Sequence, residues 1–512
     1  MSCKEGTREM TVRSITTTLV ADWPGLAWLA TTRAGEPSVQ VLHGPGVEVA
    51  DEWVCEAVWD GEFGSGDFDR TDVVAGSGVR LRGGRVIFVS SGSTVDRLLA
   101  ASRLGTLWVS NSLPCLLEAT RAAPDPAYPR YYWDFRSIVC GLRRYKRTLG
   151  TSGGPIEIVY FDNLSWDGWN LTVTQKPATA VPFSDFAAYR NYLASSMRAV
   201  AANLRDTRRD QPFAMLGTTS TGYDSPTVTV LAAEAGCDEV LSFDRARGGA
   251  ADSGEAIAER LGVRTISVPR DRWQARSLPE PAFIAANAYG EEVHYSGAEA
   301  YLRRRVLFTG YHGDKVWAKQ TNDLDGQIVR GDPSGLALAE FRLRAGFIHC
   351  PVAFWGARRV REIVALANTA EMAPWDLPGD YSRPICRRIV EEAGVDRESF
   401  GQSKLAASVV LHNEPRFMKD ESMERYLGWL RNHRRAWLAR GRLPPVPIQS
   451  LDRTIARANR IIGGPRLARL RKFPMYVQLE QRSAQRRLGP TYLRRFVFPW
   501  AVHEAKSAYR ER

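Results

Sequence analysis

The sequence predicts an α/β protein, with a β-rich amino-terminal part followed by a doubly wound parallel sheet with helical additions. The 512 residues suffice for two or three domains, each with its own core. Residues 15–175 contain short apolar runs, such as 86–89 and 107–109, bounded by Gly and Ser turn signals. From Pro182 onward, helical stretches rich in Ala, Leu and Arg alternate with short β-branched runs.

Changes in composition divide the chain into three parts. A loop at 146–155 precedes an expected strand at 156–161, and we assign this β-rich part to residues 1–180. The alternating part covers residues 181–420. The remainder, 421–512, is expected to be a basic and helical extension.

The order of elements is clearest between Pro212 and Pro269. Strands and helices alternate there, as in a parallel sheet whose ligands bind at the carboxyl ends of its strands. The expected elements are a strand at 212–216, a small-residue loop at 217–224, a helix from Ser225-Pro226 to Gly236, a strand at 239–243, a helix capped by Asp252-Ser253 and ending at Gly262, and a strand at 263–268.

Composition excludes several classes of protein. Hydrophobic residues make up 44% and charged residues 25% of the chain, which is typical of a globular protein and not of a disordered one. No run approaches the roughly 18 apolar residues of a membrane helix. The seven cysteines form no C-x-x-C pair, and residues 1–13 lack the apolar core of a signal peptide. We therefore expect a cytoplasmic protein in a reducing compartment.

Positive charge is concentrated at the end of the chain. Residues 421–512 hold 21 basic and 6 acidic residues, so they account for all of the net charge of +12. Paired basic residues alternate there with aromatic ones: Arg434-Arg435, Arg471-Lys472, Arg486-Arg487 and Arg494-Arg495 with Trp429, Trp437, Tyr476, Tyr492 and Trp500. Such a surface can attract nucleic acid, a membrane or an acidic peptide. Amphipathic helices with solvated Arg faces explain it more simply, and no nucleic-acid motif is present.

The loop at 220–225 has the chemistry to hold a polyphosphate. Its small residues allow backbone N–H groups to approach phosphate oxygens, its hydroxyls can donate, and the following helix points its amino end at the anion. Asp224 beside phosphate makes sense if Mg²⁺ lies between them. The loop reads STGYDS and resembles the S-G-G-x-D-S pyrophosphate loop of the asparagine synthetase-like ATP pyrophosphatases. This resemblance implies ATP binding by Ser220, Thr221, Gly222, Asp224 and Ser225, with Thr221 in place of the usual Gly.

A second segment, LFTGYHGDKVW at 307–317, resembles another signature of the same family, S-G-x-G-x-D-E. Gly310 and Asp314 match it, whereas His312 replaces a Gly and Lys315 replaces the Glu. The resemblance implies that Gly310 belongs to the nucleotide loop. It also implies that Asp224 and Asp314 jointly hold Mg²⁺ on ATP.

Two further segments extend the resemblance over about residues 85–410. At 381–407 an expected helix is followed by a loop with Lys404, which the resemblance places against the pyrophosphate and the developing tetrahedral centre. Residues 84–117 are similar to the end of the family's glutaminase-like (Ntn-type) domain. A working glutaminase of this family needs a Cys as its first residue, but the chain begins Met1-Ser2-Cys3-Lys4. We therefore expect a degenerate glutaminase-like domain and an amine, not glutamine, as the nitrogen source.

Two branches of the family are similar to residues 309–314, TGYHGD. In β-lactam synthetase-like enzymes this segment reads T-G-Y-G-x-D, and its tyrosine, paired with a glutamate, deprotonates the attacking amine. The resemblance implies Tyr311 as the base, although Glu340 or His349 would have to replace the missing glutamate. Lasso-peptide cyclases have a similar G-H-G-G-D-x-x-F and a degenerate amino-terminal domain. Tyr311 is equally well interpreted as a packed aromatic residue, and His312 as a turn residue.

The resemblance implies an ATP-dependent ligase that needs ATP and Mg²⁺. It would adenylate a carboxylate and join it to an amine, on a small molecule or peptide, as in lactam or macrolactam formation. An acidic leader peptide would suit the basic segment 421–512. A scaffold or binding protein that has lost the chemistry is an alternative hypothesis, which Thr221 and Lys315 favour. A tRNA-modifying enzyme is a third, which the glutaminase-like domain disfavours.

Overall fold

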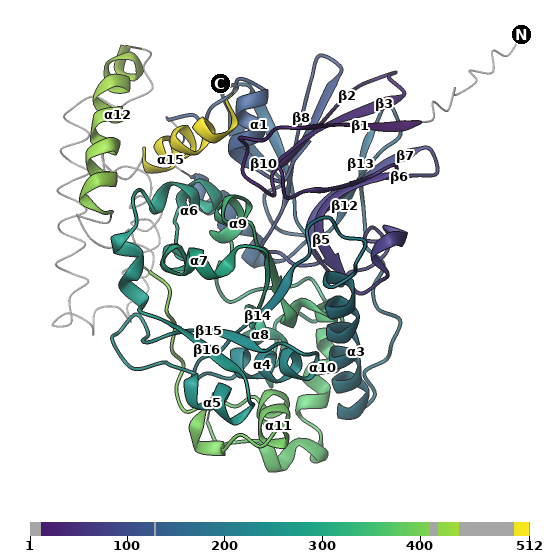
Figure 1. Ribbon diagram of the computed structural model, residues 1–512, viewed down its shortest axis with the longest axis vertical. Helices are drawn as coiled ribbons and strands as arrows, with labels where there is room; N and C mark the ends of the chain where they lie inside the picture. The colour runs from purple at the N-terminus through teal and green to yellow at the C-terminus, as the bar shows by residue number, and fades with distance from the viewer. Residues whose placement is uncertain are drawn as a thin grey trace, which may run out of the picture.

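A computed structural model of the chain describes residues 12–409 except 127, 129 and 380, together with 418–439 and 496–510. Over these residues the fold is mixed α/β, with two sheets in the amino-terminal part and a parallel sheet in the central part (Figure 1). Cys3 lies outside the described residues. Among the described helices, none has the length and apolar character needed to span a membrane.

The two amino-terminal sheets pack face to face. Their strand orders are β1-β3-β2-β9-β8-β11-β10 and β13-β12-β7-β6-β5-β4. Trp28, Val54 and Phe88, with other apolar side chains from both sheets, form one buried cluster between them, as in a β-sandwich. The strands are β1 (Ser14–Leu19), β2 (Trp28–Arg33), β3 (Ser38–His43), β4 (Glu48–Ala50), β5 (Trp53–Trp59), β6 (Val74–Arg82), β7 (Arg85–Val89), β8 (Leu98–Arg103), β9 (Thr106–Ser110), β10 (Thr148–Thr151), β11 (Gly154–Val159), β12 (Asn163–Trp166) and β13 (Leu171–Thr174).

The third sheet is parallel throughout and has the order β16-β15-β14-β17-β18. Its strands are β14 (Ala214–Thr218), β15 (Glu239–Phe243), β16 (Arg264–Val268), β17 (Arg305–Thr309) and β18 (Ile348–Pro351). The chain proceeds outward from β14 to β16, then crosses to the other side for β17 and β18. The strand order therefore reverses between β14 and β17, and ligands bind outside the carboxyl ends of strands at such a reversal.

Helices surround the parallel sheet and connect it to the sandwich (Figure 1). One of these connecting helices is α3, which packs against β5 of the sandwich and against α4 beside the parallel sheet. Asp185 caps α3 by accepting a hydrogen bond from the Ala188 N–H at 2.8 Å. The helices are α1 (Leu113–Ala119), α2 (Tyr131–Arg136), α3 (Phe186–Leu204), α4 (Asp224–Glu234), α5 (Glu255–Arg260), α6 (Glu280–Asn287), α7 (Glu299–Leu302), α8 (Gly313–Val316), α9 (Leu338–Ala345), α10 (Val360–Ala367), α11 (Pro384–Glu392), α12 (Asp420–Ala439) and α15 (Val497–Lys506).

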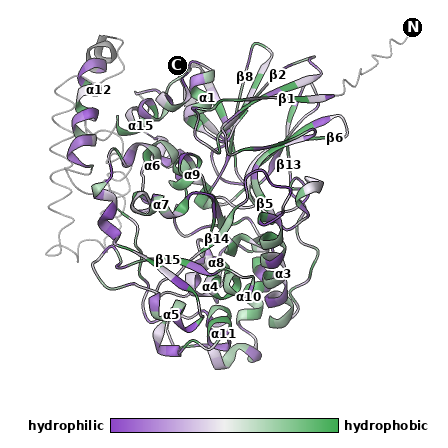
Figure 2. Ribbon diagram, in the orientation of Figure 1, coloured by the Kyte–Doolittle hydropathy of each residue, from purple (hydrophilic) through white to green (hydrophobic). Residues whose placement is uncertain are grey.

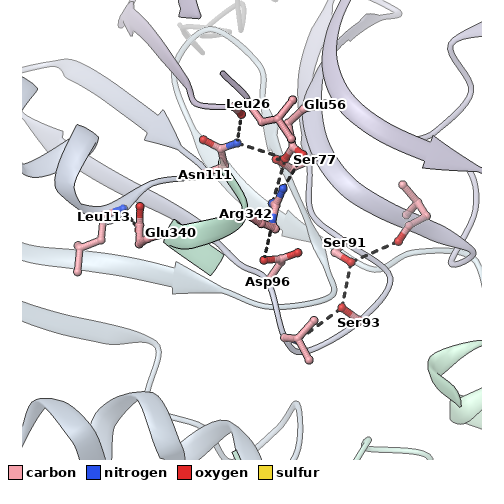
Figure 3. Close-up of polar contacts among 12 residues, drawn as sticks. Leu26, Glu56, Ser77, Ser91, Ser93, Asp96, Asn111, Leu113, Glu340 and Arg342 are labelled. Carbon is pink, nitrogen blue, oxygen red and sulfur yellow. Dashed lines mark hydrogen bonds and ion pairs between the residues drawn. The ribbon is translucent and has the colours of Figure 1, made fainter. Parts of the chain in front are cut away.

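A buried ionic network fastens α9 to the sandwich (Figure 3). Arg342 donates to both Glu56 oxygens, at 2.6 and 3.1 Å, and to Asp96 Oδ1 at 2.9 Å. Glu56 also accepts from Ser77 Oγ at 2.6 Å and from Asn111 Nδ2 at 3.2 Å. All these side chains are buried. A buried arginine needs such complete pairing, because an unpaired charge in the interior is strongly unfavourable.

The carboxyl-terminal helix α15 belongs to the core. It packs against α6 and α1, its Trp500 is fully buried, and its Phe498 ring lies 4.8 Å from that of Tyr131. The interpretation of aromatic residues as core contacts is therefore confirmed for Trp500. The neighbouring α12 is mostly hydrophilic (Figure 2). The other paired basic residues and aromatic residues of the tail lie outside what the structure describes, namely Arg471-Lys472, Arg486-Arg487, Arg494-Arg495, Tyr476, Tyr492 and the side chains of Arg434, Arg435 and Trp437.

The structure corrects two local expectations. The expected loop at 146–155 contains the strand β10, which forms a hairpin with β11. Asp252 does not cap α5, because it accepts hydrogen bonds from Thr221; Ser253, the other residue of the expected cap, does accept from the Glu255 N–H at the start of α5, at 3.3 Å. The wrong cap follows from reading a local signal for a residue whose partner lies in another loop.

Replacing Arg342 with Met is predicted to destabilise the fold by about 3–5 kcal/mol, because Glu56 and Asp96 would remain buried without their cation. Urea unfolding measures this free energy. Arg344→Met is the matched control on the same helix, since the Arg344 side chain is 45% exposed, and it should cost less than about 1 kcal/mol. Equal losses in the two variants would contradict a stabilising role for the network.

Candidate functional site

A pocket lies at the carboxyl ends of β14 and β17, where the strand order reverses. Its volume is about 240 Å³. Three segments far apart in the sequence meet there: the loop after β14, the loop after β17, and the loop after α11. Its walls include most of the residues expected from the sequence, namely Ser220, Gly222, Asp224, Ser225, Gly310, Tyr311, Asp314 and Lys404.

Side-chain hydrogen bonds fix the conformation of the first loop. Ser220 Oγ and Ser225 Oγ lie 2.8 Å apart, and Ser220 Oγ also accepts from the Gly222 N–H at 3.3 Å. Thr221 is absent from the pocket wall, since its N–H and hydroxyl both donate to Asp252, at 3.1 and 2.7 Å. The threonine in place of a glycine therefore ties the loop to Asp252. The helix α4 begins at Asp224, so its unpaired N–H groups lie beside the loop.

Two glycines allow the second loop to approach Asp224 closely. A Cβ on Gly310 would lie 2.6 Å from Asp224 atoms, and one on Gly313 would lie 2.7 Å from the Asp224 carboxyl carbon. Any side chain at either position would push Asp224 away. Between them, His312 has a φ of 78°, the left-handed backbone of a tight turn. The interpretation of His312 as a turn residue is confirmed.

Asp224 and Asp314, two of the aspartates that line the pocket, each have a cationic partner. Arg383 forms an ion pair with Asp224, and Lys404 Nζ lies 3.4 Å from Asp314 Oδ2. The Arg383 side chain is 7% exposed, whereas that of Lys404 is 63% exposed. Burial raises the pKa of Asp224, Arg383 opposes this rise, and Asp314 adds to it. The buried arginine is thus the main group that stabilises the charged form of Asp224.

The sequence did not predict a role for Arg383 in the pocket. Arg383 precedes Pro384, the first residue of α11, and its guanidinium lies over the rings of Tyr223 and Tyr381 at 5.8 and 5.4 Å. The fully buried Arg387 donates to Tyr223 Oη at 2.8 Å and fixes that ring. An arginine before a helix was visible in the sequence. Its pairing with a residue 159 positions away was not.

The surroundings of Tyr311 favour a protonated hydroxyl. Burial raises the pKa of Tyr311 well above its ordinary value, and the nearby Tyr295 and Glu292 raise it further. The Tyr311 and Tyr295 side chains share a hydrogen bond. Burial also raises the pKa of Glu292 to about 8. Tyr311 is therefore a hydrogen-bond donor at neutral pH, and its action as a base would need a partner that takes its proton.

Neither residue named as a replacement for the missing glutamate offers a carboxylate to Tyr311. Glu340 accepts from Ser112 Oγ at 2.7 Å and from the Leu113 N–H at 2.8 Å, so it is committed to the contact with the sandwich. His349 meets Tyr311 edge to face, with ring centres 5.4 Å apart, and its Nε2 lies 2.8 Å from Thr309 Oγ1. Two other carboxyl groups of the pocket, those of Glu292 and Asp332, raise the pKa of Tyr311.

The segment with Lys404 lies across the pocket and is fastened at several points. The Gly401 N–H donates to the Thr221 carbonyl at 2.8 Å, and the Val409 N–H donates to the Glu291 carbonyl at 2.8 Å. Between them, Arg270 donates to the carbonyls of residues 407 and 408 at 2.7 and 3.0 Å. A loop held at both ends fixes the backbone of Lys404 while leaving its ammonium group in the open mouth of the pocket.

The donor set fits a magnesium ion that is shared with a phosphate ligand. Within the described residues, no group of three or more His, Cys, Asp or Glu side chains could hold a metal by itself. Mg²⁺ is usually bound by one or two carboxylates together with water and substrate phosphates. Asp224 and Asp314 supply that number of carboxylates on two facing loops, next to a helix amino end suited to phosphate.

No protein-family model matches the chain, and no curated protein matches it significantly.

The buried histidines predict an acid-sensitive fold. Burial, with Arg342 and Arg330 nearby, lowers the pKa of His349 to about 3, whereas the unfolded value is about 6.5. Between these values the unfolded chain binds a proton that the folded chain does not, so the free energy of unfolding falls as the pH falls. From pH 7 to pH 5 this amounts to about 2 kcal/mol.

His349→Gln should remove about that much of the pH dependence, by the same linkage. Urea unfolding of the wild type and the variant at pH 7 and pH 5 measures it. An unchanged pH dependence would mean that His349 is protonated in the folded protein.

Proposed function

We propose that this chain is an ATP-dependent amide-forming ligase. A carboxylate oxygen of the substrate attacks the α-phosphorus of ATP, and pyrophosphate leaves. The nitrogen of an amine then attacks the resulting acyl-adenylate, AMP leaves, the nitrogen releases a proton to water, and an amide is formed. In this proposal the β-sandwich is a degenerate glutaminase-like domain and the parallel sheet is an asparagine synthetase-like ATP pyrophosphatase domain.

One observation carries the proposal: the loops after β14 and β17 bring Asp224 and Asp314 to one pocket at the reversal of the parallel sheet. Two carboxylates would repel a polyphosphate unless a divalent cation lay between them. Hydroxyls of the first loop, the amino end of α4 and Lys404 complete a surface that suits a metal-bound triphosphate. A parallel sheet alone would not support the proposal, because many functions share that fold.

Each residue has a defined part in this scheme. Magnesium, when bound to Asp224 and Asp314, would neutralise charge on the phosphates. Ser220 and Ser225 donate to phosphate oxygens, and Lys404 stabilises the charge that develops on the leaving pyrophosphate. Tyr311 lies at the same pocket, and its protonated hydroxyl would orient the reacting groups by donating to them instead of to Tyr295. In this scheme the side chains of the pocket position the reacting groups and stabilise the charge that develops on the phosphates.

Asp224→Asn and Asp314→Asn are each predicted to lower ATP–pyrophosphate exchange by at least about 100-fold, because one missing carboxylate removes a metal ligand. The assay uses radiolabelled pyrophosphate and a panel of carboxylates, with AMP release as a second readout. Circular dichroism should show that both variants stay folded.

Asp238→Asn is the matched control, because Asp238 is exposed and precedes β15 at the opposite end of the sheet. It should keep full exchange. An Asp224→Asn variant with full activity would refute the proposed site. Failure of the wild type to bind Mg-ATP would favour the alternative function, a scaffold that keeps the fold without the chemistry.

A further inference from the structure

Arg383 is bound to one oxygen of the Asp224 carboxylate, the group proposed to hold the metal of a metal-bound nucleotide. Its Nη1 donates to Asp224 Oδ1, and both side chains face the pocket. A metal ion and a guanidinium are competing partners for one carboxylate. Any ligand that places a cation on Asp224 must therefore weaken or displace this ion pair.

The guanidinium of Arg383 lies beside two aromatic rings of the pocket wall. Residue 383 itself directly precedes α11 and is not helical, with φ −135° and ψ 82°. The aromatic rings of Tyr223 and Tyr381 both lie next to the guanidinium, and the centres of the two rings are 5.0 Å apart. Cation–π contact with two rings stabilises the charge over a range of orientations, since it does not depend on one hydrogen-bond direction.

The neighbouring arginines of α11 are fixed in a way that Arg383 is not. Arg387 is bound to Tyr223 Oη at 2.8 Å and to Glu391 at 3.0 Å, and it is fully buried. Arg388 pairs with Glu371 and Glu392 at 2.6 and 2.8 Å, outside the pocket. Arg383, which directly precedes the helix, instead pairs with Asp224 in the pocket wall, so it is the arginine of this segment that a ligand in the pocket can contact.

A buried guanidinium that loses its carboxylate needs another anion, because an unpaired charge is costly in a protein interior. Phosphate oxygens are the best replacement, since the planar guanidinium can donate two parallel hydrogen bonds to them. The amino end of α4, next to Asp224, is where such oxygens would lie. The geometry thus couples release of Asp224 to capture of phosphate.

We propose that Arg383 exchanges partners: it holds the Asp224 carboxylate in the free protein and binds the phosphate oxygens when a metal-bound nucleotide enters. The exchange rests on the proposed function, because it requires a nucleotide in this pocket. It adds two consequences. Metal alone binds weakly, because Arg383 competes for Asp224, and nucleotide binding is strengthened by the arginine that the metal releases.

The test measures metal and nucleotide separately. Electron paramagnetic resonance of Mn²⁺ reports binding of the metal alone, and calorimetry reports binding of Mg-ATP, both at pH 8 on the full chain. Arg383→Gln should bind Mn²⁺ alone about tenfold more tightly and Mg-ATP about tenfold more weakly, the scale of one charge-assisted hydrogen bond. Arg388→Gln, on the same helix but outside the pocket, should match the wild type in both assays.

Arg383→Lys keeps the charge without the second hydrogen bond, so it should bind Mn²⁺ as weakly as the wild type and Mg-ATP with intermediate affinity. Opposite shifts for the two ligands in Arg383→Gln support the exchange. Weaker binding of both, tighter binding of both or no change in either would overturn it, even if the wild type binds Mg-ATP and the proposed function stands. A wild type that binds no Mg-ATP would refute both proposals. If Arg383→Gln is unstable, the Mn²⁺ and Mg-ATP affinities of Arg383→Lys still test the exchange.

Discussion

The close approach of two loops at the reversal of the parallel sheet is the constraint on which the pocket depends. Gly310 and Gly313 have no side chain to separate the second loop from Asp224, and a Cβ at either position would lie within 2.7 Å of it. Asp314 lies in the first turn of the short helix α8 that follows and lines the same pocket as Asp224. Because the carboxyl ends of β14 and β17 are adjacent, the sheet places the two loops side by side.

The pocket also depends on the amino-terminal sandwich. Arg330 donates to the carbonyl of Thr94 at 3.3 Å and to that of Ser334, next to the wall of the pocket. Glu292 accepts from the backbone of Gly335 at 2.7 Å and of Ala337 at 3.1 Å, at the start of α9. The same helix carries Arg342 into the sandwich. The amino-terminal sandwich thus has a structural function at the pocket, since it supports one of the pocket walls.

Much of the fold could be predicted from the sequence because its signals are local. Apolar runs between glycine and proline residues predicted the position of β15. The alternation of strands and helices predicted a parallel sheet, with ligand-binding loops at the carboxyl ends of its strands. The loop residues also follow from local chemistry, since small residues before Asp224 suit an anion. The partners of the charges could not be predicted, because Arg383 meets Asp224 and Arg342 meets Glu56 only after distant segments pack together. Nor does a local pattern show that Thr221 turns toward Asp252.

The most direct test of the account is a crystal structure of the chain with Mg²⁺ and α,β-methylene-ATP, an analogue that cannot release pyrophosphate. The account predicts the triphosphate between the loop at 220–225 and the turn at 310–314, with the metal on Asp224 and Asp314. It would be contradicted by a nucleotide bound elsewhere, or by an empty pocket at a saturating concentration of the analogue.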